Sequence, residues 1–218
     1  MIMNYQLIRS KRKTLSLQIN NNAELIVRAP NRLSVKKIEQ FIDEKSNWID
    51  KKSAAIQAKK LKKSSYLEGE KFLYLGGEYP LSVNIDHAKG LEFDGQMFSL
   101  DRGGKEDFLA WYKATFKKIA LPRLEYYAKE NKLIYQQVRF KAQKTLWGSC
   151  SYVNNINLNY LLIQAPIGVI DYVIVHELAH IKHKNHSRNF WKFVNQMLPN
   201  YKASKRWLQD NGYRLKNL

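Results

Sequence analysis

The chain has 218 residues, of which 44% are hydrophobic and 12% aromatic, enough for one sizeable core or two modest lobes. Its 37 Lys and Arg against 19 Asp and Glu give a net charge of +18, which favours anionic partners such as nucleic acid, nucleotides or acidic surfaces. The single cysteine excludes an internal disulfide. No stretch resembles a secretory signal or approaches the roughly 18 apolar residues of a membrane span, so a cytoplasmic protein without a membrane partner is expected.

The first elements predicted are a β-hairpin and a helix. Hydrophobic and polar residues alternate from Leu15 to Val27 on both sides of an Asn-rich turn, which is typical of a hairpin. Isoleucines recur along one side of the following segment, which predicts a helix that runs to about Lys60. Ser34 can cap the start of this helix.

Residues 66–100 are strand-like and rich in turns. Gly76-Gly77 separates two hydrophobic segments, and Asp94-Gly95 is the strongest hairpin signal in the chain. The stretch Asp101-Arg102-Gly103-Gly104 then interrupts the pattern. A boundary is therefore predicted between a β-rich N-terminal lobe with one helix, residues 1–103, and a second domain, residues 104–218.

The second domain is predicted to begin with a helix over residues 105–130, which Pro122 can kink or split. Alternation predicts a strand over residues 138–142 and another over residues 156–162. Another helix is predicted after Pro166, since apolar residues recur at spacings of three and four: Ile167, Ile170, Ile174, Leu178 and Ile181.

Four of the five histidines fall within the eleven residues HELAHIKHKNH, from His176 to His186. On a helix, His176 and His180 project from the same face and can bind one metal ion. Glu177 leans over the same space, where it can take a proton from a metal-bound water. Catalytic zinc needs three protein ligands and one open position, so a third donor is required.

His186 is the nearest candidate for the third ligand. Six residues turn a continuous helix by roughly 240°, so the helix must stop before His186 can return to the metal. Lys184-Asn185 offers such a stop, because Asn tolerates the left-handed conformation. His183 is the weaker alternative, since a helical residue at that position would overshoot the ion.

The segment Trp147-Gly148-Ser149-Cys150 lies between the two predicted strands. It is interpreted first as a packed turn, with the tryptophan buried and the glycine supplying an unusual backbone angle. A cysteine nucleophile at Cys150 is the alternative, although the nearby histidines are better explained by a metal.

The run HELAHIKHKNHSRNFW, from His176 to Trp191, resembles the signature of the YgjP-like metallopeptidase domain family, related to the Wss-like and SprT-like zincins. Trp147-Gly148-Ser149-Cys150-Ser151 and Asn157-Leu158-Asn159 resemble two further motifs of that family, and the similar layout covers nearly the whole chain. The resemblance implies an α+β fold in which residues 104–218 form a zincin-like hydrolase domain, its HExxH helix packed on a small β-sheet.

The resemblance also implies functional residues. Zinc would bind His176, His180 and His186, and Glu177 would be the general base. In zincin-type architectures a strand beside the active-site helix aligns an extended substrate by backbone pairing, and the two strands around Trp147 are the candidates for that role. A further donor would stabilise the developing negative charge, and spacing does not choose among four candidates: Tyr160, Tyr172, Arg188 and Tyr201.

Three functions are compatible with these residues. The first is a zinc metallopeptidase that acts on a peptide or protein. The second, also attached to the resembling family, is nucleotide pyrophosphohydrolysis, although magnesium-triphosphate chemistry prefers oxygen ligands. The third is a nucleic-acid-associated protein with a structural zinc, which Cys150 would close as fourth ligand. Any nucleic-acid association through the dispersed basic residues is expected to be non-specific.

Overall fold

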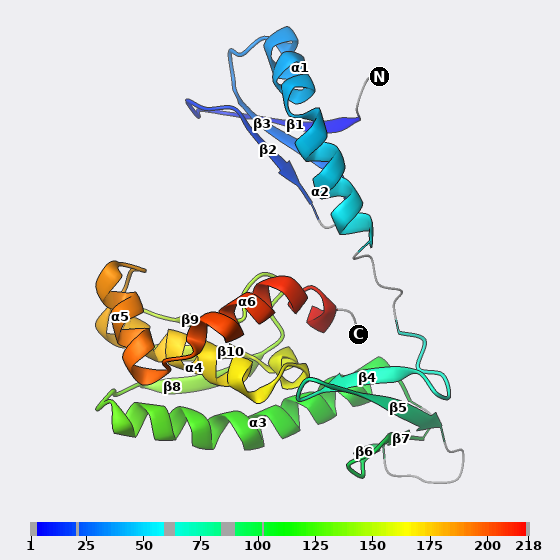
Figure 1. Cartoon of the computed structure of the whole chain (residues 1–218), viewed down its shortest axis with the longest axis vertical. Helices are drawn as coiled ribbons and strands as arrows, with labels where there is room; N and C mark the ends of the chain where they lie inside the picture. Colours follow the sequence, from blue (N-terminus) through cyan, green and yellow to red (C-terminus); the bar gives the residue numbers. More distant parts are fainter. Residues whose placement is uncertain (1–3, 21, 59–63, 84–89, 102, 217–218) are drawn as a thin grey trace. The chain divides into compact units, whose positions relative to one another are not determined.

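The structure is a computed structural model of the chain, and it describes residues 4–20, 22–58, 64–83, 90–101 and 103–216 (Figure 1). Contacts divide the chain into two compact units, residues 1–62 and residues 63–218. Each unit has its own hydrophobic core. The two units together contain both helices and several separate sheets, which makes the fold α+β.

The sheet of the first unit has three strands. β1 (Tyr5–Ser10) pairs in parallel with the central strand β3 (Leu25–Pro30), and β2 (Ser16–Ile19) pairs antiparallel on the other side. The turn between β2 and β3 is held by Asn20, whose side-chain oxygen accepts hydrogen bonds from the backbone N–H groups of Asn22 and Glu24. The predicted hairpin is therefore confirmed.

Two helices, α1 (Val35–Glu44) and α2 (Ser46–Ala58), follow the sheet. Ser34 caps α1 as predicted, because its hydroxyl accepts from the backbone N–H of Lys37. The prediction of one continuous helix is wrong: Lys45 leaves helical geometry, and its N–H bonds to Ile42 one residue closer than in an α-helix. The buried residues of this unit come from β3, α1 and α2: Leu25, Val27, Ala29, Ile38, Ile42 and Ile49.

The second unit begins with a four-stranded sheet in the order β4-β5-β7-β6. Its strands are β4 (Lys71–Tyr74), β5 (Gly77–Val83), β6 (Leu91–Phe93) and β7 (Phe98–Leu100). Asp94 and Gly95 form the predicted turn between β6 and β7: the Asp94 carboxylate accepts from Gln96 and Met97, and Gly95 has a φ of 102°.

The contacts of this sheet place the division between the units elsewhere than the sequence predicted. Phe72 of β4 stacks on Phe108 of α3 (Lys105–Glu130) with ring centroids 4.0 Å apart. Leu75 donates its backbone N–H to Ile163, and Gly76 lies against Pro166. The predicted boundary after residue 103 would separate these partners, whereas contacts divide the chain after residue 62.

α3 runs without interruption from Lys105 to Glu130, so Pro122 does not split it. Its buried face is an aromatic and aliphatic stripe: Phe108, Tyr112, Phe116, Ala120, Leu124 and Ala128. Tyr112 is fully buried and donates its hydroxyl to the carbonyl of Leu73, which ties α3 to β4. Within the part of the chain that the structure describes, no helix is long and apolar enough to cross a membrane.

A second sheet of this unit has the order β8-β10-β9. β10 (Asn155–Asn159) is parallel to β8 (Gln137–Lys141) and antiparallel to β9 (Gly148–Cys150), which makes β9 an edge strand. The predicted strand over residues 156–162 ends early, because the Asn159 side chain accepts from Leu161 and caps the 3₁₀ helix η1 (Tyr160–Gln164).

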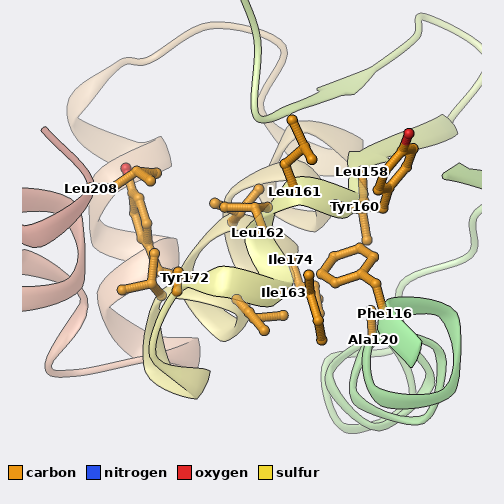
Figure 2. Packing of buried hydrophobic residues seen from close by; sticks show 14 of the residues in the cluster. Phe116, Ala120, Leu158, Tyr160, Leu161, Leu162, Ile163, Tyr172, Ile174 and Leu208 are labelled. Atoms are coloured by element: carbon orange, nitrogen blue, oxygen red, sulfur yellow. The ribbon is translucent and has the colours of Figure 1, made fainter. Parts of the chain in front are cut away.

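Three helices complete the unit: α4 (Ile167–Lys182), α5 (Arg188–Met197) and α6 (Tyr201–Asn211). α4 packs between α3 and α6 and also contacts α5, β9 and β10 (Figure 1). Figure 2 shows the interior, with Phe116 and Ala120 of α3 at one end, Leu162 and Ile163 in the middle, and Leu208 of α6 at the other end. This packing fixes both faces of α4, the helix that carries the HExxH sequence.

Candidate metal centre

The end of α4 determines where the histidine cluster lies. The helix ends at Lys182, and His183 has an extended backbone with φ −128° and ψ 97°. The predicted end at Lys184-Asn185 is therefore wrong by two residues, and Asn185 is not among the residues with positive φ in the described chain. The change of direction at His183 brings His186 back toward the helix.

His176, His180 and His186 form a group that could hold a metal ion, with one nitrogen of each within 4.8 Å of the other two. The Nε2 atoms of His176 and His186 are 3.0 Å apart. Two ligands of a tetrahedral zinc ion, each about 2.0–2.1 Å from the metal, would be separated by roughly 3.3 Å. The three rings are therefore close to the arrangement that a zinc ion requires.

Two contacts fix the orientation of these rings. His180 Nδ1 is 3.0 Å from the carbonyl oxygen of His183, so the protonated Nδ1 leaves Nε2 free for a metal. The buried ring of Phe190 lies under all three imidazoles, with centroid distances of 5.0, 4.6 and 4.8 Å to His176, His180 and His186. Ser187 caps α5 and thereby places Phe190.

His183 takes a different direction from these three residues. Its ring packs on Phe193 of α5, with centroids 5.8 Å apart, and it is outside the metal-binding group. Only its backbone carbonyl contributes, as the acceptor for His180. The structure thus separates His183 from His186, as the sequence expectation did.

The electrostatics of the cluster favour neutral imidazole, the form that binds metal. Burial, together with the nearby charges of His180, His186 and Lys205, lowers the pKa of His176 to about 3. Burial also lowers the pKa of His180. Protons are therefore poor competitors for these two rings at neutral pH.

Glu177 is buried, with 5% of its surface exposed, and burial raises its pKa to about 8. It lies against Gly148 of β9, where a Cβ atom would stand 2.5 Å from Glu177 Oε1 and 2.7 Å from Cγ. Gly148 is thus required for space. The predicted unusual backbone angle is wrong, because φ of Gly148 is not positive.

The other residues of this segment support β9. Trp147 packs on Gly212 and under the Lys216 ammonium, 4.6 Å from its ring centroid. Cys150 is half-buried, and burial raises its pKa, which disfavours a nucleophilic thiolate. Among the described residues, Cys150 is not part of the metal-binding group, so the structure gives no fourth protein ligand there.

Two of the four candidates for stabilising negative charge lie beside the histidines. Tyr172 packs edge-on against His176 with centroids 5.8 Å apart, and burial raises its pKa to about 12, so that its hydroxyl stays protonated. Tyr201 stacks between Tyr172 and Trp191. Tyr160 lies at the opposite end of the interior from Tyr172 (Figure 2), and Arg188 is an exposed residue of α5.

The Trp191 ring adds a feature that the sequence did not predict. Trp191 stacks on His186 with centroids 5.8 Å apart and carries the Lys205 ammonium on its face, 4.0 Å from the centroid. The aromatic residues after His186 suggested only a packing helix. Lys205 comes from α6, and no sequence spacing connects it with the histidines.

A family model for the YgjP-like metallopeptidase domain matches residues 13–211. The chain belongs to this family. Two solved structures are similar to part of this YgjP-like chain: the metallopeptidase zymogens of Pyrococcus abyssi abylysin and of Methanocaldococcus jannaschii jannalysin. The match to the abylysin zymogen is 23% identical in sequence, covers 42% of this chain and 93% of the abylysin chain, and has a TM-score of 0.38. The match to the jannalysin zymogen is 22% identical in sequence, covers 44% of this chain and 94% of the jannalysin chain, and has a TM-score of 0.35.

No curated protein matches the chain. Membership of the YgjP-like family makes the chain a metal-dependent peptidase, and a peptidase domain takes a protein or peptide as substrate. The three-histidine group of α4 and the following loop offers donors for the metal ion of such an enzyme.

Proposed function

We propose that this YgjP-like chain is a zinc-dependent peptidase with a zincin-like catalytic unit. His176, His180 and His186 hold the zinc ion, and Glu177 is the general base. One observation carries the proposal. The buried carboxyl group of Glu177 directly follows His176 on α4, and His176 is the first of three converging imidazoles. This combination supplies two metal ligands and a proton acceptor within about one turn of α4, and the following loop supplies His186.

The choice of zinc rests on the donor set. The group consists of three imidazoles and contains no carboxylate, and imidazole nitrogen suits zinc better than magnesium or calcium. When bound with an open position, zinc polarises a carbonyl oxygen and lowers the pKa of a water molecule from 15.7 to about 7. The same donor set argues against the nucleotide alternative, because a magnesium triphosphate needs oxygen ligands.

Glu177 is suited to hold and move a proton. Its pKa of about 8 in the metal-free chain is a consequence of burial, and a bound cation nearby would lower that value. The carboxylate would then accept a proton and return it to the leaving amine. Gly148 leaves the space in which this side chain lies.

Strand β9 offers an alignment surface for an extended peptide. Asn159 donates its N–H to Trp147, and Ser151 donates to Asn155. Because hydrogen-bonded pairs alternate in an antiparallel ladder, Trp147, Ser149 and Ser151 face β10, and the backbone groups of Gly148 and Cys150 point to the free edge. A peptide paired at this edge would pass the carboxyl group of Glu177.

The test compares peptide and nucleotide turnover on one zinc-loaded preparation. A mixture of unstructured peptides should be cleaved, a chelator should abolish cleavage, and added zinc should restore it. Nucleoside triphosphates should be hydrolysed far more slowly by the same preparation. Rapid release of pyrophosphate together with intact peptides would overturn the proposal in favour of the nucleotide alternative.

A further inference from the structure

The part of the chain that supplies the candidate metal centre has almost no carboxylates. Residues 131–209 contain eleven Lys and Arg but only two acids, Asp171 and Glu177. Asp171 is buried and paired with Arg123, its two oxygens each 2.8 Å from Nη1. Glu177 is the buried carboxyl group of the centre itself. The exposed carboxylate of Asp210, just beyond this stretch, pairs with Arg206 rather than with the cations beside the histidines.

Lys205 lies beside the histidines, across the ring of Trp191. Its ammonium lies 4.0 Å from the centroid of Trp191, and the Trp191 ring is 5.8 Å from the rings of both His176 and His186. An aromatic face holds a cation without neutralising it. The charge of Lys205 is thus held beside the metal centre and remains available to an anionic group.

Lys184 is a second cation near the centre, at the end of the edge strand. Its ammonium donates to Asn154 Oδ1 at 2.7 Å and to the carbonyl oxygens of Tyr152 and Ser151 at 3.2 and 3.3 Å. These neutral acceptors fix its position and leave its charge uncompensated. The ion pairs of the described residues include neither Lys184 nor Lys205.

We propose that this peptidase selects extended peptides that carry aspartate or glutamate beside the scissile bond, with Lys205 as the specificity residue and Lys184 extending the positive rim along β9. The inference rests on the proposed function: a peptide paired at the free edge of β9 would pass Lys184 at the end of that strand, and its scissile bond at the histidines would lie beside Lys205. An acidic side chain gains a favourable charge interaction at this rim, and a basic one is repelled. Like-charge repulsion makes the discrimination against basic peptides as important as the attraction.

The test uses the zinc-loaded full chain and three peptide sets that differ only in the residues flanking a common core: glutamate, glutamine or lysine on either side. The glutamate set should exceed the glutamine set in kcat/KM by about threefold to tenfold, and the lysine set should fall below it by a similar factor. Raising the salt concentration should shrink both ratios, because exposed charges are screened.

Charge variants identify the residue responsible. Lys205→Met should remove most of the preference, and Lys205→Glu should shift it toward the lysine set. Lys118→Glu is the matched control: Lys118 is an exposed lysine of α3, a helix that contributes none of the residues of the centre, so the ratios should not change. Circular dichroism and zinc content check that each variant is folded and loaded.

The outcomes separate this inference from the proposed function. Equal cleavage of all three sets, or an acidic preference that survives Lys205→Glu, overturns the inference alone. Cleavage of no peptide by the zinc-loaded chain overturns both. The inactive variant Glu177→Gln allows binding to be measured without cleavage, for a single-stranded oligonucleotide and for the glutamate peptide. If adding Lys205→Met weakens binding of the oligonucleotide more than binding of the peptide, Lys205 serves nucleic acid and the inference is overturned.

Discussion

Gly148 of β9 and Glu177 of α4 are in direct contact, and a Cβ atom at Gly148 would stand 2.5 Å from Glu177 Oε1. The glycine therefore brings the edge strand against the side chain that follows His176 on α4. Any side chain at position 148 must displace Glu177 or move β9 away from α4. A sequence motif interpreted as a packed turn is thus an edge strand in contact with the proposed general base.

Gly148→Ala should abolish most of the activity while retaining zinc. The added methyl group displaces the Glu177 carboxyl group, so peptide turnover should fall by about 10² or more, and overpacking should cost about 1–3 kcal/mol in the free energy of unfolding. Gly168→Ala is the control, because its Cβ would meet Ser204 Oγ at an ordinary 3.5 Å. Equal activity of the two variants would contradict the role of Gly148.

The two histidines of the loop after α4 should differ in their effect on zinc content. His186→Ala removes one of three converging imidazoles and should lose most of the metal affinity. His183→Ala should keep one zinc per chain, since the ring packs on Phe193 and only the backbone carbonyl of His183 reaches His180. Metal analysis after dialysis measures both, and full zinc content in His186→Ala would refute the ligand set.

The stability of the metal-free protein should depend on Glu177. Its pKa is raised to about 8 by burial, from 4.5 as the ordinary value, so the protonated form stabilises the fold and that stability is lost as the pH rises through 8. Between pH 6.5 and pH 8 the contribution of Glu177 to the free energy of unfolding should fall by about 1.5–2 kcal/mol, at about 1.36 kcal/mol per pKa unit.

Urea unfolding of the metal-free chain at these two pH values measures the effect. The lowered pKa values of His176 and His180 act in the opposite direction, and they still raise the free energy of unfolding by up to about 0.4 kcal/mol each in this window, because the unfolded imidazoles are half protonated at pH 6.5. In Glu177→Gln the fall should be replaced by a small rise of less than about 1 kcal/mol from the two histidines. An unchanged slope in that variant would show that Glu177 is not the group responsible.

Local patterns explain which parts of the fold were predictable. The spacing of His176 and His180 and the apolar stripe of the same helix predicted α4, and Asp94-Gly95 predicted the β6–β7 turn. Ser34 was recognised as a cap because capping depends on residues within one helical turn. Each of these features is determined by neighbours in the sequence.

Features that depend on distant partners were missed or misinterpreted. The division of the chain was predicted after residue 103, whereas contacts divide it after residue 62. The sequence did not reveal that Phe72 packs on Phe108, on the other side of the predicted break. The need for glycine at position 148 comes from Glu177, and the place of Lys205 comes from Trp191. No periodicity or spacing in one sequence encodes such contacts.

The most direct test of the account is the zinc content and peptide turnover of Glu177→Gln. The substitution keeps the shape of the side chain and removes its basicity, so the variant should fold, bind one zinc ion and lose about 10²- to 10⁴-fold in turnover. Because Glu177 is outside the three-histidine group, its loss should not release the metal. Near-full turnover by the zinc-loaded variant would contradict the assignment of Glu177 as the general base.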